Sequence, residues 1–393
     1  MSFSKQFNNE IVFIGKRSYR NLGCYDYEYL LNLKNNFKNY KITFFHSYLY
    51  DQPKIKGVKH INIFKYNKKG FILKFFLYIY SLIFITFYIL RKRPSSVHCQ
   101  WFLLPFIDLI WIKTIKIFGW NGNLIQTIHN AKSRYNIYQK FLITLCIKEL
   151  DTIILHSSKC KDYLLKNYKF KKGVNIFVGR HGFIKNIIEE KILKSEIDVY
   201  EKILSYRDKY KNIFIHVGHV AQYKGFDVLY NEWQKYKINS KNKFNSALLI
   251  LGKFDKFSKP KIKNLLNDES IIICDQFVSD KLLDFSVDVS DYILLPHSYI
   301  SHSAIYSSFL KKNKPFIFYK NEYNHMISHA AFNKTGISFD QKNIFLKDLL
   351  IDIEKNKVQY KFDRKNWVEA IDYFSWTNCF SKKLLLNIYR INN

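Results

Sequence analysis

One stretch of the sequence combines residue types suited to holding an anion. An apolar run from Ile213 to Val217 ends at Gly218, and the pair Lys224-Gly225 follows six residues later, before apolar residues at helix-like spacing. Glycine lets the backbone approach a ligand closely, and lysine supplies a point charge. A helix that begins after the second glycine turns its N-terminus toward the same place, where negative charge is favoured. The pattern predicts a strand, a loop with one cation, and a helix around an anionic ligand.

A second group of charged residues follows the first apolar run of the chain. Asp26 and Glu28 lie in the segment CYDYEYL, and an enzyme that deprotonates a hydroxyl group needs such a carboxylate as its general base. The alternative for this pair is an acidic helix start, which the helix dipole favours. Lys16, Arg17 and Arg20 in the preceding loop are expected either to meet the phosphate of an acceptor or to form an ordinary solvated loop.

Several enzyme classes lack their signatures in this sequence. There is no Asp-x-Asp and no histidine or cysteine cluster with metal spacing, so we expect no metal and no other cofactor. There is also no Gly-x-x-x-x-Gly-Lys-Ser/Thr and no Gly-x-Gly-x-x-Gly after a strand, which argues against an ATPase or a dehydrogenase. The six cysteines are scattered, and residues 1–9 are polar, which favours a cytosolic protein with reduced thiols.

The chain is strongly basic. Lysine and arginine number 63 against 32 acidic residues, a net charge of +31, which attracts nucleic acid, anionic lipid or phosphorylated substrates. No zinc-finger spacing, RNP-like motif or basic zipper favours nucleic acid, so we do not expect it as a partner. A solvated, soluble surface and attraction to an anionic membrane surface remain as two explanations of the charge.

Residues 71–90, FILKFFLYIYSLIFITFYIL, contain a single charge, Lys74, and have cations on both sides. The length permits a transmembrane helix. A lone segment with cations on both flanks gives no clear orientation, however, and a helix that lies in the interface or in the core fits better. The sequence leaves these three alternatives open.

Short apolar runs alternate with amphipathic patterns such as Leu22–Phe37 and Gln139–Leu150, which indicates parallel βαβ units. The runs include 11–15, 41–45, 96–99, 124–129, 152–156, 175–178, 212–218, 247–252, 270–274, 292–296 and 315–318. A chain of 393 residues suits two such domains. The polar segment 185–205 is interpreted as the linker between a domain over 1–190 and a domain over 205–372, with the ligand at the carboxyl ends of the strands.

The stretch 218–225 resembles the phosphate-binding strand–loop–helix of GT-B glycosyltransferases, particularly the large family 4 type, whose usual text is Gly-Arg-x-x-x-x-Lys-Gly. Both glycines and the lysine are present, and His219 stands at the arginine position. Further segments agree in order and spacing: VHCQW (97–101), LIQTIHN (124–130), DTIILHSSKCKDYL (151–164), HG (181–182), LLILGKFD (248–255), SDYILLPHS (290–298) and FSWTNCFSKKLLLNIY (374–389). The resemblance covers about residues 97 to 389, and residues 1–96 match poorly, as expected for an acceptor-binding half.

The resemblance implies the GT-B fold, which is an α/β architecture of two Rossmann-like domains with a cleft between them. The first domain binds the acceptor, the second binds a nucleotide sugar, and a C-terminal helix over 373–393 packs back on the first. It also implies that Lys224 and its flanking glycines meet the donor's diphosphate. His219 is then a partly charged substitute for arginine, or a histidine that caps a strand end. His129 contacts the transferred sugar, and Asn130 is its companion or a turn residue. The resemblance further implies a donor contact for His297 and an acceptor contact for Trp101, and the basic loop residues Arg17 and Arg20 are the other candidates for binding the acceptor.

One departure from the family is clear. The second domain usually carries two glutamates, seven residues apart, that hold the donor's sugar and ribose. Alignment on the Lys-Pro at 314–315 puts Ile300 and Ser308 at those positions, and neither is acidic. The donor and the retention of anomeric configuration therefore stay open. The residues expected to take over donor contacts are Ser301, His302 and Ser303, with the backbone amides of their loop.

These features predict a glycosyltransferase that moves a sugar from a UDP- or GDP-linked donor to a lipid-linked oligosaccharide. The pathway implied by the resemblance is bacterial surface polysaccharide synthesis (O-antigen, capsule or exopolysaccharide). The enzyme would be peripheral, on the inner face of the cell membrane, and would retain configuration without a metal. An inverting transferase with Asp26 as base is the alternative enzyme, and a noncatalytic module that binds nucleotide or glycan is the alternative from another class.

Overall fold

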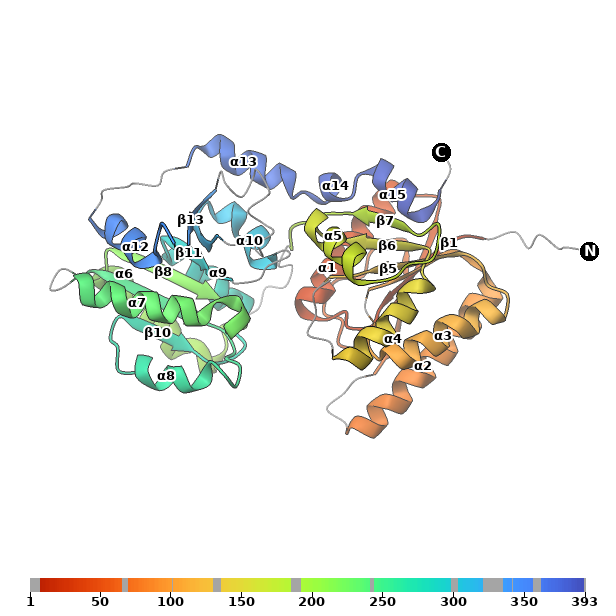
Figure 1. Ribbon diagram of the computed structural model, residues 1–393, viewed down its shortest axis with the longest axis horizontal. Helices are drawn as coiled ribbons and strands as arrows, with labels where there is room; N and C mark the ends of the chain where they lie inside the picture. Colours follow the sequence, from red (N-terminus) through yellow and green to blue (C-terminus); the bar gives the residue numbers. More distant parts are fainter. Residues whose placement is uncertain are drawn as a thin grey trace, which may run out of the picture. The chain divides into compact units, whose positions relative to one another are not determined.

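The computed structural model describes residues 8–65, 70–100, 102–129, 136–184, 192–240, 244–297, 303–320, 335–340, 342–355 and 362–391. The chain divides into two compact units (Figure 1). Unit 1 contains residues 1–185 and 375–393, and unit 2 contains residues 186–374. The chain therefore returns to unit 1 for its last segment.

Unit 1 is built on a parallel seven-stranded sheet with the order β3-β2-β1-β4-β5-β6-β7. Its strands are β1 (Asn8–Gly15), β2 (Lys41–Ser47), β3 (Val58–Phe64), β4 (Pro94–Cys99), β5 (Asn123–Thr127), β6 (Thr152–Leu155) and β7 (Asn175–Val178). Its helices are α1 (Arg20–Asn36), α2 (Phe71–Lys92), α3 (Pro105–Ile117), α4 (Ile137–Lys148), α5 (Ser158–Asn167), α14 (Trp376–Cys379) and α15 (Lys382–Tyr389). Because helices cover both faces of the sheet, its strands read as continuous apolar runs.

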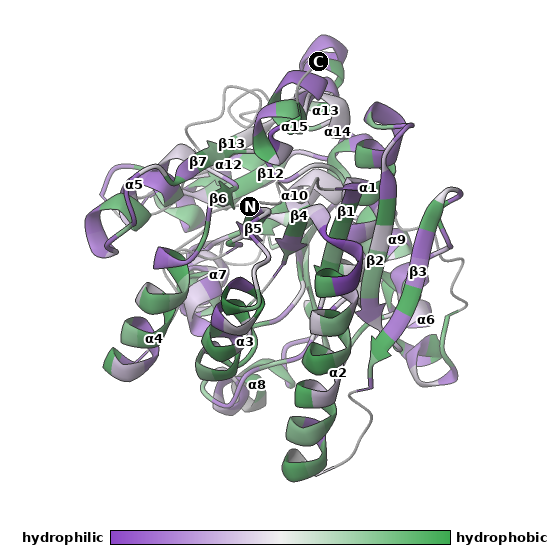
Figure 2. Cartoon of the chain, turned by 90° about the vertical axis from the view of Figure 1, so that its right-hand side faces the viewer, coloured by the Kyte–Doolittle hydropathy of each residue, from purple (hydrophilic) through white to green (hydrophobic). Residues whose placement is uncertain are grey.

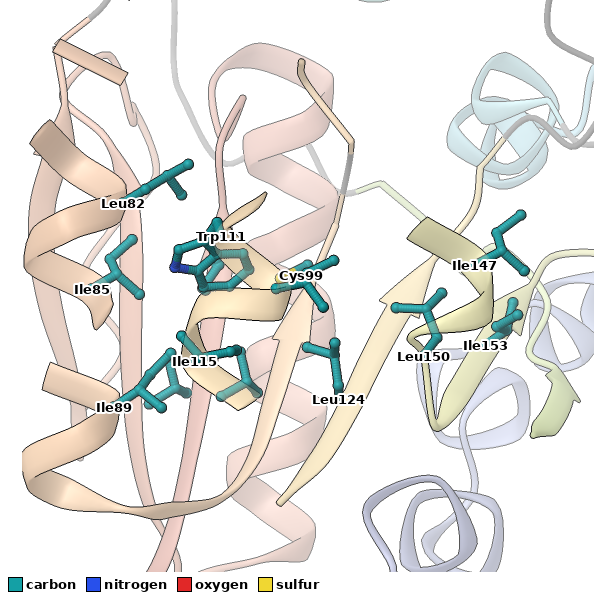
Figure 3. Packing of buried hydrophobic residues seen from close by; sticks show 14 of the residues in the cluster. Leu82, Ile85, Ile89, Cys99, Trp111, Ile115, Leu124, Ile147, Leu150 and Ile153 are labelled. Atoms are coloured by element: carbon teal, nitrogen blue, oxygen red, sulfur yellow. The ribbon is translucent and has the colours of Figure 1, made fainter. Parts of the chain in front are cut away.

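Two hydrophobic clusters lie on the two faces of this sheet. One joins the strands to α2, α3, α4 and α5, and Figure 3 shows Leu82, Ile85 and Ile89 of α2 directed at Trp111 and Ile115 of α3. The other cluster joins the strands to α1, α14 and α15. The C-terminal segment is also tied down by hydrogen bonds, as the indole of Trp376 donates to the carbonyl oxygen of Phe183 at 2.6 Å. Residues 375–391 are therefore part of the core of unit 1.

Unit 2 holds a parallel six-stranded sheet with the order β10-β9-β8-β11-β12-β13. Its strands are β8 (Asn212–Val217), β9 (Ser246–Leu251), β10 (Ile271–Cys274), β11 (Tyr292–Leu295), β12 (Phe316–Tyr319) and β13 (Gly336–Phe339). Its α-helices are α6 (Ile197–Lys209), α7 (Phe226–Ser240), α8 (Lys259–Leu265), α9 (Asp280–Val289), α10 (Ala304–Phe309), α12 (Leu346–Glu354) and α13 (Arg364–Tyr373), with 3-10 turns at η1 (Lys194–Glu196), η2 (Gln222–Lys224) and η4 (Leu310–Lys312). The strands, α7, α8 and α12 share one hydrophobic cluster.

The predicted α/β architecture of two parallel-sheet units is confirmed. Each predicted run falls on a strand, and the runs omit β3 and β13. Both are edge strands, and β3 mixes exposed polar residues such as Lys59 with buried ones, which breaks the continuous apolar pattern. The interval interpreted as a linker overlaps helix α6, which is polar on its outer side and buries Ile203 and Tyr206 on its inner side.

Helix α2 contains the apolar segment 71–90. Among the described helices, α2 is the one whose length and apolar composition would allow it to cross a membrane. Its inner residues Tyr78, Leu82, Ile85 and Ile89 are at most 3% exposed and belong to the core of unit 1. One side of α2 is therefore that of a core helix of a folded domain.

Candidate active site

The centre of each sheet is the point at which the strand order reverses. In unit 2 this point lies between β8 and β11, and in unit 1 it lies between β1 and β4. Ligands of open α/β sheets bind outside the carboxyl ends of the strands at this point. Gly218 follows β8 and His297 follows β11, so both predicted donor residues lie at the reversal point of unit 2.

Three glycines shape the unit 2 site. Gly218 has φ +97°, and a Cβ on Gly252 would lie 1.9 Å from the Gly218 carbonyl oxygen. Gly225 has φ +76°, and a Cβ there would lie 1.6 Å from the carbonyl oxygen of Pro296. The loops after β8, β9 and β11 are therefore packed together at a closeness that only glycine allows. The predicted glycine positions at 218 and 225 have a structural reason in this packing.

Lys224 ends the 3-10 turn η2 and points back toward the end of β8. Its Nζ atom lies 3.5 Å from the place that a Cβ on Gly218 would occupy. The side chain is partly buried, and burial lowers the pKa of its ammonium group to about 8. Among the described residues, no carboxylate forms an ion pair with it. Near neutral pH this site therefore holds a mostly protonated, partly desolvated cation that an anionic ligand would stabilise.

Two buried histidines lie beside Lys224. Burial, with the charge of Lys224, lowers the pKa of His297 well below its ordinary value. Burial also lowers the pKa of His216 to about 4, and its Nδ1 donates to the Leu294 carbonyl oxygen at 3.2 Å. Both rings are therefore neutral near neutral pH. Among the described residues, the buried His216 Nε2 and His297 Nδ1 have no hydrogen-bond partner. Each is available to a polar ligand group.

The other predicted donor residues have mixed positions. Ser303 is buried and caps α10, where its Oγ accepts from the Tyr306 amide at 3.2 Å. Ser308, at one missing glutamate position, lies within α10, and His219 is exposed. The predicted residues Ser301, His302 and Asn130, and the Ile300 position, lie outside the described residues.

In unit 1, four adjacent strands each deliver one polar side chain just beyond their carboxyl ends. Gln100 follows β4, His129 follows β5, His156 follows β6 and His181 follows β7. The rings of His129 and His156 lie 4.8 Å apart, and those of His156 and His181 lie 5.4 Å apart, measured between centroids. Tyr25 of α1 packs against all three histidine rings. All five residues are buried.

The hydrogen-bond partners assign the protons of His156 and the proton on Nδ1 of His129. His156 Nδ1 must donate, because it lies 2.7 Å from the carbonyl oxygen of Gly179. Burial lowers the pKa of His156 to about 4, so its Nε2 accepts, and His129 Nδ1 at 3.2 Å donates. His129 Nε2 lies 2.8 Å from the side-chain amide of Gln100. Either that amide is turned so that its nitrogen donates, or His129 carries two protons. Both ring nitrogens of His129 thus contact protein groups.

Asp26 is buried in α1 and contacts the hydroxyl of Ser18. Burial raises the pKa of Asp26 to about 8, against the opposing effect of this hydrogen bond. Ser18 Oγ also lies 2.9 Å from the carbonyl oxygen of Gly15, which can only accept. The single Ser18 hydroxyl hydrogen is therefore shared between the Gly15 carbonyl oxygen and the carboxyl group of Asp26. A carboxyl group with such a pKa matches the needs of acid–base catalysis near neutral pH.

The expected phosphate-binding loop after β1 needs one correction. Lys16 is 1% exposed, and its Nζ pairs with the buried carboxylate of Asp108 at 2.5 Å. The Tyr78 hydroxyl also donates to Asp108. Lys16 is consequently occupied within the core and cannot meet an acceptor in this conformation. Arg17 is exposed, the side chain of Arg20 is not described, and Trp101 lies outside the described residues.

Sequence reasoning missed Gln100, His156, His181 and His216 as site residues. Each lies within or shortly after an apolar run that became a strand. A search for polar residues at run ends would have found the first three. His216 points inward from the middle of the run 212–218, so it carries no such signal. Within the described ranges, no group of three or more histidine, cysteine or acidic residues is arranged to hold a metal ion.

The chain is similar to known proteins in structure and not in sequence. No protein-family model matches the chain, and no curated protein is similar in sequence. Sucrose-phosphate synthase from Thermosynechococcus elongatus superimposes with a TM-score of 0.69 at 13% identity over 98% of each chain. The lipopolysaccharide outer core galactosyltransferase WaaB, in its apo form, gives 0.62 at 14% identity over 97% of this chain and 100% of its own. Anabaena HepE in complex with UDP gives 0.63 at 10% identity over 97% and 100%.

The chain therefore has the GT-B fold of these glycosyltransferases, as the resemblance predicted. At these identities the similarity establishes the fold and leaves the chemistry to be argued from the site.

Proposed function

We propose that the protein is a glycosyltransferase that moves a sugar from a UDP- or GDP-linked donor to a lipid-linked oligosaccharide. The acceptor chain would belong to bacterial surface polysaccharide synthesis, on the cytoplasmic face of the membrane. The observation that carries the proposal is the Lys224 ammonium group, partly buried beside Gly218 with no described counter-ion. A diphosphate supplies the negative charge that this position lacks.

The chemistry of glycosyl transfer explains why such a cation is useful. As the bond between the sugar and the diphosphate breaks, negative charge builds up on the leaving group. A fixed cation aimed at that charge favours the transition state over the ground state, with effects of several kcal/mol. Lys224 would supply the cation, and the neutral His216 and His297 would offer ring nitrogens to donor oxygens. This arrangement needs no metal ion, and exposed His219 would add a partial charge.

Unit 1 would hold the acceptor and the reacting sugar. His129 is the member of the histidine row that we assign to the transferred sugar, and the contacts from Gln100 and His156 fix its orientation. Arg17, exposed in the loop after β1, would meet an anionic part of the acceptor. We propose that the anomeric configuration is retained.

A second candidate mechanism is favoured by a specific observation. The buried Asp26 has a pKa near 8, so a neutral pH leaves a usable fraction ionised. An inverting enzyme would use this carboxylate to deprotonate the acceptor hydroxyl. Proton NMR of the first product formed distinguishes the two mechanisms through the anomeric coupling constant. Asp26 is assigned the base role only if the product is inverted.

The names of the structural neighbours support this proposal. One is described as a galactosyltransferase of the lipopolysaccharide outer core, and another was solved in complex with UDP. Both descriptions belong to those proteins, and their relevance to this chain rests on the shared fold.

A thermal-shift screen of the purified protein against UDP, GDP and CMP tests the proposal. A ligand present at a hundred times its Kd stabilises the folded state by about 2.7 kcal/mol. We expect stabilisation by UDP or GDP in the wild type and a loss of most of it in Lys224→Ala. The matched control is Lys202→Ala, which removes an exposed lysine of α6. The absence of stabilisation by any nucleotide, or equal stabilisation of both variants, would refute the assigned role of Lys224.

A further inference from the structure

The outward side of three neighbouring helices of unit 1 is unusually apolar. Along α2, the residues at three- and four-residue spacing that face away from the sheet are hydrophobic. These exposed residues are Ile72, Leu73, Phe76, Tyr80, Ile83, Phe84 and Phe87. Phe76 is 61% exposed and Phe87 is 70% exposed. A helix that only covered a sheet would turn polar residues outward.

The helices α3 and α4 extend this surface. Helix α3 contacts both α2 and α4, and the three cover the same face of the sheet (Figure 2). Their exposed hydrophobic residues are Phe106, Ile110, Ile117, Ile137, Tyr138 and Phe141, with Phe118 directly after α3. We call the outward side of α2, α3 and α4 the apolar surface. Contiguous exposed apolar area of this kind is uncommon on soluble proteins and marks contact with a partner or a membrane.

Helix α7 of unit 2 shows what an ordinary covering helix of this chain looks like. It buries Phe226, Leu229 and Trp233 against its sheet. Its exposed residues are Asn231, Lys235, Ile238 and Asn239, and three of these four are polar. The apolar surface of unit 1 is therefore a local feature of these helices, since the aromatic-rich composition of the chain does not impose it on α7.

The exposed charges within these helices have one sign. Lys74, Arg91, Lys113 and Lys140 are exposed or partly exposed on them. The carboxylate of Asp108 is the acidic group within the bounds of α2, α3 and α4, and it is buried against Lys16. An apolar surface surrounded by cations and lacking exposed anions complements a lipid bilayer with anionic headgroups.

The surface is also oriented with respect to the site. In a parallel sheet each covering helix starts at the carboxyl ends of the strands, so α2, α3 and α4 begin at the edge that carries the site residues. The exposed side chains at these starts include Ile72, Phe106 and Ile137, of which Ile137 is 89% exposed. The Lys16–Asp108 pair, with Tyr78, joins α2 and α3 to the loop after β1. The start of the surface is thereby held at a fixed position relative to that loop.

We propose that the apolar surface is a membrane-docking face that lies on an anionic bilayer, with α2 parallel to the membrane plane. The edge of the unit 1 sheet that carries Gln100 and His129 then lies close to the headgroups. A lipid-linked acceptor would present its sugars at that edge without leaving the bilayer. This acceptor is the part of the inference that rests on the proposed function. Helix α2 does not span the membrane, because its inner side belongs to the core of the domain.

Vesicle binding of the full chain tests this proposal. Sucrose-loaded phosphatidylcholine vesicles with about 30% phosphatidylglycerol are sedimented with the wild type, Phe76→Gln/Phe87→Gln and Ile238→Gln/Val368→Gln. The last variant is the matched control, since it removes two comparably exposed hydrophobic residues of unit 2 (76% and 58%). We expect the partition coefficient to fall at least about tenfold in the first variant and less than about twofold in the control. Equal binding by the two variants would overturn the proposal.

Further measurements exclude the other occupants of the surface. All six cysteines are buried, so Tyr80→Cys introduces an accessible thiol for an environment-sensitive fluorophore. We expect the fluorescence to be quenched more by nitroxides near the headgroup end of the acyl chains than by nitroxides near the bilayer centre. The reverse order would indicate a spanning helix and refute the proposal. Light scattering tests whether the surface binds a second copy of the chain. A dimer that Phe76→Gln/Phe87→Gln abolishes, in a protein that does not bind vesicles, would assign the surface to this second copy and refute the proposal. Nucleotide-dependent stabilisation of the same variant in solution reports on the proposed function separately.

Discussion

The charge of Lys224 predicts a trade between stability and binding. The pKa of Lys224 is lowered from 10.5 to about 8, because the ammonium group is partly buried without a described counter-ion. Each pKa unit corresponds to about 1.4 kcal/mol, so the ligand-free fold loses up to about 3 kcal/mol by keeping this charge. Solvent screening at a partly exposed site reduces the loss to about 1–3 kcal/mol. Replacement by methionine, which has a similar shape and no charge, should therefore stabilise unit 2.

The pH dependence follows from the same shift. Below about pH 8 the lysine is protonated in the folded and the unfolded states, so the folded state carries the full cost of the partly buried charge. Between about pH 8 and 10.5 the unfolded chain binds the proton and the folded one does not, so wild-type stability rises with pH. The advantage of Lys224→Met should accordingly be largest near neutral pH and shrink as the pH rises through this interval.

Differential scanning fluorimetry and calorimetry measure this effect. For a unit of this size we expect Lys224→Met to raise the midpoint of unit 2 unfolding by about 2–10 °C near neutral pH and to remove most stabilisation by UDP. The control Lys202→Met should change stability by less than about 0.5 kcal/mol. A Lys224→Met protein that is no more stable than the wild type, or that binds UDP with unchanged affinity, would refute the reasoning.

Three further predictions concern Asp26, Gly225 and the metal requirement. Burial raises the folded pKa of Asp26 to about 8, so the contribution of its protonated form to stability is present below about pH 4 and is lost as the pH rises to 8. Asp26→Asn should therefore gain stability relative to the wild type over that interval in pH-dependent melts. A constant difference between the two proteins would contradict this. Gly225→Ala places a Cβ 1.6 Å from the Pro296 carbonyl oxygen and should lower the free energy of unfolding by at least about 2 kcal/mol in denaturant unfolding. The control Gly119→Ala, where φ is +82° but the space is open, should lower it by about 1 kcal/mol. Equal losses in the two variants would contradict the packing argument. Because Lys224 supplies the cation, sugar transfer should survive EDTA, and a complete loss that manganese restores would show that a metal does this work.

The fold was predictable from the sequence to a large degree. Strands in a parallel sheet are buried on both faces, so runs such as 175–178 and 292–296 mark them directly. The edge strands β3 and β13 were not predicted, because the outer edge of each strand is partly solvated. Helix α6 was not predicted, because most of its residues face water. The loop that holds Lys224 was also predictable, since all of its parts lie within eight consecutive residues.

The rest of the site depends on contacts between distant residues. Lys16 is neutralised by Asp108, which lies 92 positions away, and no local pattern links the two. The histidine row assembles Gln100, His129 and His156 from three strands at separations of 29 and 27 residues. The two faces of α2 became distinct only when its inner residues packed on the sheet, because its sequence is apolar on both sides.

The most direct test of the account is a crystal structure of the protein with UDP or GDP bound. The account predicts the diphosphate at the carboxyl end of β8, with an oxygen about 2.8 Å from Lys224 Nζ and close to Gly218. A nucleotide bound elsewhere on the chain, or bound here with the Lys224 side chain turned away from its phosphates, would contradict it.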